Sequence, residues 1–154
     1  MNMQSSKLTR LAGRLLMAGL TVALVSCANG GFMGKGSSTT NMNVALNGAS
    51  EVPANTSTAT GNAKLVLDTA TKALTVNVTT TGITGTAAHI HQGAAGTNGG
   101  VIIPLAESPA GSGTWTASVT LTDAQLATLM AGGYYINVHS AAKPGGEIRG
   151  QIVK

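Results

Sequence analysis

Apolar and polar residues alternate along most of the chain from residue 42 onward. The alternation is clear at Met42, Val44 and Leu46, and it recurs in residues 63–67 and 74–78. Because successive side chains of a strand point to opposite faces, a period of two predicts strands with one buried face. Similar short segments predict further strands near residues 88–92, 101–105, 115–121, 134–140 and 147–153.

One segment has a helical pattern instead. Residues 122–125 have the spacing of a capping box, and Leu126, Leu129 and Met130 follow at helical spacing. The glycine pair at 132–133 ends this predicted short helix, which we expect to cover one end of the fold. About eight short strands and one short helix predict an all-β protein, a Greek-key antiparallel β-sandwich.

The three histidines of the chain all lie on two predicted strands. His89 and His91 share the polar face of one strand, and His139 lies on the polar face of residues 134–140. Imidazole nitrogen is a good ligand for copper and for zinc. If the two strands are neighbours, we expect a metal site on the outer face, with ring nitrogens within about 4 Å of one another. Three solvated side chains without a ligand remain the alternative.

Further polar residues of the last two strands are candidates for the hydrogen bonds that orient metal-binding imidazoles. These candidates are Asn137, Glu147, Arg149 and Gln151. Arg149 could guide an anion toward the metal, but an ion pair with Glu147 or Glu51 is the favoured interpretation. The glycine-rich residues 93–100 lack the ending of a phosphate-binding loop, so we expect a flexible connection there.

Residues 1–26 precede the alternating pattern and are typical of a secretory signal peptide. Lys7, Arg10 and Arg14 are followed by an apolar run that is too short to anchor the chain across a membrane. These three residues also supply most of the formal net charge of +4, since six basic and five acidic residues remain without them. A net charge of about +1 offers no basic surface for nucleic acid, so we expect no nucleic-acid partner.

The segment Leu-Val-Ser-Cys at residues 24–27 resembles the lipobox of bacterial lipoproteins. The resemblance implies cleavage before Cys27, lipidation of its sulfur and anchoring in the cell envelope. Ala28 is not aspartate, which by resemblance to Gram-negative sorting rules implies the outer membrane, with the periplasmic or surface side left open. Residues 27–40 then form the lipidated cysteine and a Gly- and Ser-rich flexible tether. Residues 41–154 form a single domain.

Three segments together resemble the CHRD domain, which is named after chordin. They are Leu46 to Pro53, His89 to Gly93, and Tyr135 to Ser140 running into the Pro144 to Gln151 segment. The resemblance covers residues 43–153 and implies an extracytoplasmic domain. It implies little about activity, and the growth-factor partner of chordin does not carry over because its cysteine-rich modules have no counterpart here.

The strand with His89 and His91 also resembles, more distantly, the copper strand of copper/zinc superoxide dismutase, a β-sandwich that would place copper on these residues and His139. The chain departs from that family in having no fourth histidine to bridge two metals, no recognisable counterpart of the family's zinc site and no disulfide. Three hypotheses follow. The first is an envelope lipoprotein that binds copper or zinc, the second a metal-free module for a protein or glycan partner. The third, ranked last, is a dismutase-like redox enzyme, and no catalytic residue is assigned.

Overall fold

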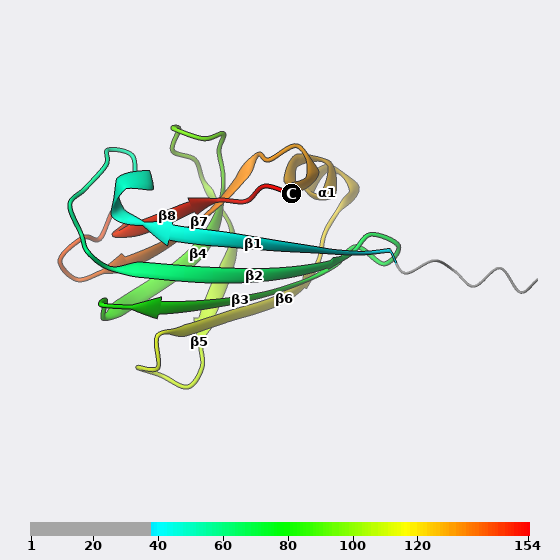
Figure 1. Cartoon of the computed structure of the whole chain (residues 1–154). Coiled ribbons are helices and arrows are strands. Elements are labelled where there is room, and N and C mark those ends of the chain that lie inside the picture. Colours follow the sequence, from blue (N-terminus) through cyan, green and yellow to red (C-terminus); the bar gives the residue numbers. More distant parts are fainter. Residues whose placement is uncertain (1–37) are drawn as a thin grey trace, which may run out of the picture. The chain divides into compact units, whose positions relative to one another are not determined.

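The computed structural model describes residues 38–154, which form a barrel of eight strands with one α-helix near one end (Figure 1). The elements are β1 (Thr39–Asn47), η1 (Gly48–Ser50), β2 (Thr60–Asp68), β3 (Ala73–Thr81), β4 (Gly85–Gln92), β5 (Val101–Glu107), β6 (Thr114–Thr120), α1 (Asp123–Met130), β7 (Tyr134–Ser140) and β8 (Ile148–Gln151). The predicted signal peptide, Cys27 and most of the predicted tether lie outside the described residues.

The strands follow one another around the barrel in the order β1-β2-β3-β6-β5-β4-β7-β8, and every neighbouring pair is antiparallel. Pairing of Asn47 with Arg149 joins β1 to β8 and closes the sheet on itself. The predicted all-β antiparallel fold is confirmed, but the predicted Greek-key sandwich is corrected to a closed barrel. A period of two marks an inward face equally well in both architectures, so the pattern alone does not distinguish them.

The barrel interior consists of the apolar residues that the alternation predicts. In β1, β2 and β3 every second residue is buried, and in β4 and β7 Ala88, Ile90, Ile136 and Val138 are at most 1% exposed. Trp115 on β6, with 4% of its surface exposed, is the largest of these side chains. Burying them removes their apolar surface from water, which is the main favourable contribution to folding.

Several element boundaries differ from the predicted ones. β1 begins at Thr39, so the last two residues of the predicted tether belong to the strand. After β1 the chain turns into η1, whose first residue is preceded by Asn47, and the side chain of Asn47 accepts a hydrogen bond from the backbone N–H of Ser50. β8 contains only Ile148–Gln151, which is shorter than the predicted strand.

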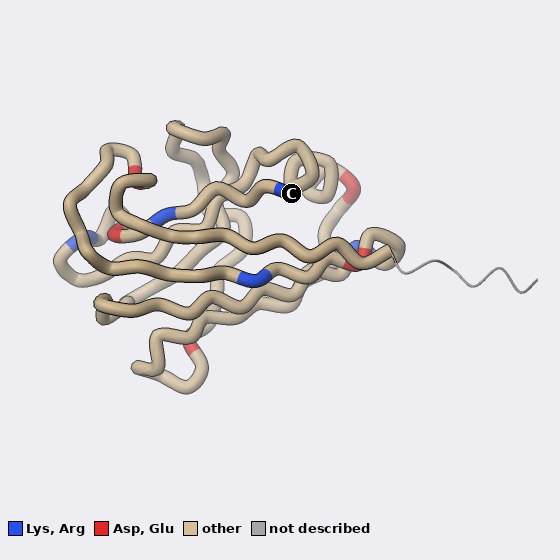
Figure 2. Tube along the Cα trace, viewed as in Figure 1, with Lys and Arg blue, Asp and Glu red and all other residues tan. Residues whose placement is uncertain are grey.

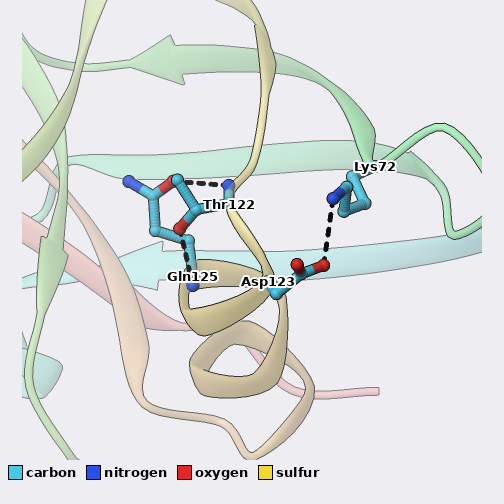
Figure 3. A network of polar contacts seen from close by, with 4 residues as sticks. All are labelled: Lys72, Thr122, Asp123 and Gln125. Atoms are coloured by element: carbon cyan, nitrogen blue, oxygen red, sulfur yellow. Dashed lines mark hydrogen bonds and ion pairs between the residues drawn. The ribbon is translucent and has the colours of Figure 1, made fainter.

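Helix α1 begins as the capping box predicts (Figure 3). The hydroxyl of Thr122 accepts a hydrogen bond from the backbone N–H of Gln125, whose side chain in turn accepts one from the backbone N–H of Thr122. Lys72 from the β2–β3 turn forms an ion pair of 2.9 Å with Asp123. Leu129 is 1% exposed and packs the helix onto the core.

Charged residues are few and widely spaced along the described part of the chain (Figure 2). Lys, Arg, Asp and Glu do not gather into a continuous stripe in this view, and most of the trace carries uncharged side chains. Within residues 38–154, no helix has the length and apolar character needed to span a membrane.

Candidate metal centre

The two strands that carry the histidines are neighbours in the barrel. In the register of β4 and β7, His89 pairs with Asn137, His91 with Tyr135, and Ala87 with His139. The three imidazoles therefore meet on one face, and one ring nitrogen from each lies within 4.8 Å of the other two. Three nitrogens bound to one ion at about 2.1 Å lie about 3.4–3.6 Å apart in tetrahedral or trigonal geometry. The cluster is thus wider than the predicted separation of about 4 Å, and its largest nitrogen–nitrogen separation would have to shorten by about 1.2–1.4 Å to hold an ion.

The imidazoles of His89 and His139 are in direct contact. The Nδ1 atom of His89 lies 3.1 Å from the Nε2 atom of His139, and their ring centroids are 5.0 Å apart. His91 completes the cluster, with its centroid 5.5 Å from that of His89 and 6.1 Å from that of His139. All three side chains belong to β4 and β7, whose backbone pairing with each other holds their Cα positions, although the pairing of β4 with β5 shifts register between Ile90 and His91.

Two backbone carbonyls fix the tautomers of the cluster. The Nδ1 atom of His91 lies 3.0 Å from the carbonyl oxygen of Gly99, and Nδ1 of His139 lies 2.9 Å from that of Pro144. A carbonyl oxygen only accepts hydrogen bonds, so each Nδ1 carries the hydrogen. The Nε2 atom of neutral His91 therefore keeps a free lone pair, and the lone pair of Nε2 in a neutral His139 faces Nδ1 of His89. A hydrogen bond from the other ring nitrogen is the arrangement that orients metal-binding histidines.

His91 is the most deeply covered of the three. It is 9% exposed, and its Nε2 is buried without a hydrogen-bond partner in the described structure. The three histidine side chains lie on the strand faces opposite the apolar interior, as predicted. His91 is nevertheless not open to solvent, because the loop of residues 93–100 covers it and the carbonyl of Gly99 contacts its Nδ1. Burial is the main cause that lowers the pKa values of His91 and His89, so both are held as neutral potential ligands at neutral pH.

The loop of residues 93–100 is anchored at several points, which corrects the prediction of a flexible connection. Arg149 donates hydrogen bonds of 2.7 Å to the carbonyl of Thr97 and 3.1 Å to Oδ1 of Asn98. Gln151 donates a third bond, of 3.0 Å, to the carbonyl of Gly93. These side chains come from β8, far along the sequence, so the composition of the loop did not reveal its anchoring.

Tyr135 is a residue of the site that the sequence reasoning did not select. Its ring stacks on His91 with a centroid distance of 4.9 Å and an interplanar angle of 6°. The guanidinium carbon of Arg149 lies 3.3 Å from the centroid of the same ring, and the Tyr135 hydroxyl accepts a hydrogen bond from the N–H of Gly99. The strand alternation did place Tyr135 on the face of His139, and that was the available signal.

Asn137 connects the site to the loop that follows η1. Its Nδ2 donates a hydrogen bond of 2.7 Å to Oε1 of Glu51, whose side chain is buried. Burial raises the pKa of Glu51, while the positive charge of Arg149 opposes that rise. The predicted ion pair of Arg149 is not formed, because its guanidinium instead donates hydrogen bonds to the loop and packs on the ring of Tyr135. Within residues 38–154, the ion pair that forms is the one between Lys72 and Asp123.

Glu147 also holds loops together beside the histidines. Its carboxylate accepts hydrogen bonds from the hydroxyls of Ser57, at 2.6 Å, and Ser140. These bonds lower its pKa, the one from Ser140 having the larger effect. The hydrogen bonds described here for Asn137, Glu147, Arg149 and Gln151 join loops and neighbouring strands. The groups that orient the rings of His91 and His139 are instead the backbone carbonyls of Gly99 and Pro144.

An antiparallel β-barrel with a cluster of three histidines between β4 and β7 defines the architecture of this protein. The family model of the CHRD domain matches residues 42–152, and the chain belongs to the CHRD domain family. The match runs from β1 past the end of β8 and contains all three histidines. Comparisons with curated proteins and with solved structures found no match.

Proposed function

We propose that this CHRD-domain protein binds one copper or zinc ion through His89, His91 and His139. The observation that carries the proposal is the Nε2 atom of His91, a lone pair that is buried without a partner beside two other imidazoles. A buried acceptor without a hydrogen bond costs about 1–3 kcal/mol. A metal ion would satisfy this atom, and water would complete any open position.

The groups around the imidazoles support this function. Carbonyls of Gly99 and Pro144 orient two of the rings. Arg149 and Gln151 hold the loop that carries Gly99. Because mutation of such outer groups typically weakens metal binding about 10- to 100-fold in known sites, these residues are expected to matter for affinity as well as for stability.

The proposed location is the cell envelope, with the chain anchored by lipid at Cys27. Support comes from the basic and apolar leader and the lipobox-like residues 24–27. The proposal predicts that the expressed protein incorporates labelled palmitate and that Cys27→Ser abolishes the incorporation. Labelling that persists in the Cys27→Ser variant would contradict lipidation at this residue.

Isothermal titration calorimetry with Cu²⁺ and Zn²⁺ tests the metal site. We expect one ion per chain in the unsubstituted protein and loss of binding in His89→Ala and in His139→Ala. Gln92→Ala is the matched control, because Gln92 is exposed on the strand that carries two of the ligands. No binding by the unsubstituted protein, or equal binding by all variants, would reject the site.

The alternative is a metal-free module that binds a protein or glycan. The contact between His89 and His139 favours it, since a hydrogen bond between the two rings needs no ion. In that case His89→Ala would lower the thermal unfolding midpoint without changing a metal titration. Dismutase-like redox chemistry, the hypothesis we rank last, would require activity of the copper-loaded protein in a superoxide assay.

A further inference from the structure

A buried cation lies close to the proposed ligands. Arg149 is 2% exposed, and its guanidinium is fixed by Thr97, Asn98 and the face of Tyr135. Arginine stays protonated in proteins, so this position carries a permanent positive charge. Hydrogen bonds to neutral loop acceptors do not cancel that charge.

A single aromatic ring separates this charge from a ligand. β7 lies between β4 and β8 in the barrel, so His91 reaches the ring of Tyr135 from one side and Arg149 reaches it from the other. The hydrogen bond from the N–H of Gly99 to the Tyr135 hydroxyl holds the ring in place. The stack is therefore a fixed feature next to the site.

Negative charge is scarce in the same region. The proposed ligands are three neutral imidazoles, and the acceptors that orient two of them are neutral carbonyls. Glu51 interacts electrostatically with Arg149 and accepts a hydrogen bond from Asn137, while Glu147 accepts hydrogen bonds from two serine hydroxyls. Glu51 at most balances Arg149, and Glu147, which stays ionised, is opposed by the positive charge of Lys143. No carboxylate is therefore left over to compensate the charge of a bound ion.

Resting on the metal site proposed above, we propose that its preferred ion is monovalent copper and that Arg149 sets this preference. Moving a charge out of water costs energy that grows with the square of the charge. In this partly buried site, where His91 is buried and the other two imidazoles are of intermediate exposure, an uncompensated Zn²⁺ or Cu²⁺ therefore loses more hydration energy than Cu⁺. Cu⁺ is also stable with three ligands, whereas structural and catalytic Zn²⁺ usually takes four. The three imidazoles alone therefore supply enough ligands for Cu⁺.

Competition titrations of the full chain measure the preference. Cu⁺ is titrated under anaerobic reducing conditions against a colorimetric copper(I) chelator, and Zn²⁺ against a zinc indicator. We expect Cu⁺ to bind more tightly than Zn²⁺. Equal or tighter binding of Zn²⁺ would overturn the proposed preference and leave the metal site intact, whereas binding of neither ion would reject the site itself.

A matched pair of variants tests the role of Arg149. Arg149→Lys keeps the charge and loses the planar contacts, whereas Arg149→Met loses both. We expect the ratio of Cu⁺ to Zn²⁺ affinity to fall on the order of tenfold in Arg149→Met, the effect of one unit charge at an effective dielectric constant of about 20. Arg149→Lys should keep most of the ratio. An unchanged ratio in Arg149→Met, or an equal fall in both variants, would overturn the role, and the comparison of ions in the unsubstituted protein stands even if a variant fails to fold.

Discussion

The Nδ1 atom of His89 lies 3.1 Å from the Nε2 atom of His139, and the other ring nitrogen of His139 faces the carbonyl of Pro144. In a neutral His139 the Nε2 atom is then an acceptor, so His89 must donate from Nδ1. Coordination through the same two nitrogens would require His89 to move its hydrogen to Nε2.

Long-range ¹H–¹⁵N NMR of the histidine rings tests this tautomer change. Without metal we expect Nδ1–H tautomers for all three histidines. Saturation with diamagnetic Zn²⁺ should leave His91 and His139 with Nδ1–H and convert His89 to Nε2–H. Unchanged ring-nitrogen shifts at saturating Zn²⁺ would contradict a metal centre built from these atoms.

Gly150 determines whether β8 can approach β1 and close the barrel. A Cβ atom at this position would lie 2.4 Å from the carbonyl oxygen of Ala45 and 2.5 Å from the side chain of Val44. We expect Gly150→Ala to lower the free energy of unfolding by about 1–3 kcal/mol through overpacking. Gly100 has no atom within 4 Å of such a Cβ, so Gly100→Ala should change stability by less than about 0.5 kcal/mol. Chemical denaturation measures the free energy of unfolding of both variants. Equal losses in Gly150→Ala and Gly100→Ala would contradict a close approach of β8 to β1 at Gly150.

The cap of α1 should matter more than the ion pair beside it. Thr122→Ala removes the acceptor for the N–H of Gln125 and is expected to cost about 1 kcal/mol of stability. Lys72→Met removes the ion pair with Asp123, whose side chain is 91% exposed, and should cost less than about 0.5 kcal/mol. Chemical denaturation of the two variants measures both stability losses. A larger loss of stability in Lys72→Met than in Thr122→Ala would contradict this ranking.

We expect the stability of the folded protein to fall at acid pH because of Asp68. Hydrogen bonds from the Ser38 hydroxyl and the backbone N–H groups of Ala70 and Thr71 lower the pKa of Asp68 from 3.8 to about 2. The folded state therefore keeps the carboxylate ionised where the unfolded chain becomes protonated. This stabilisation is complete above pH 3.8 and is lost as the pH falls toward 2.

Thermal unfolding of the unsubstituted protein and of Asp68→Asn between pH 7 and pH 2 tests the acid dependence. The difference between their midpoints should be constant near neutral pH and shrink across the window in which the carboxylate becomes protonated. A difference that stays constant down to pH 2 would show that the hydrogen bonds of Asp68 do not depend on its charge.

Much of the fold and part of the site could be predicted from local patterns. Alternation at Met42, Val44 and Leu46 identifies the buried face of β1, and the capping box at Thr122 identifies the start of α1. The same alternation places His89, His91 and His139 outside the apolar interior. These features depend on neighbouring residues, which is why sequence alone was sufficient for them.

The sequence by itself determined which residues form strands, which faces are apolar and which side chains are candidate ligands, because the period of a strand is a local property. Only the tertiary structure decided that β4 lies beside β7, that the sheet closes between Asn47 and Arg149, and that Tyr135 lies between Arg149 and His91. Those contacts join residues far apart in the chain. Their geometry depends on strand order, register and packing, which a pattern of polar and apolar positions does not specify.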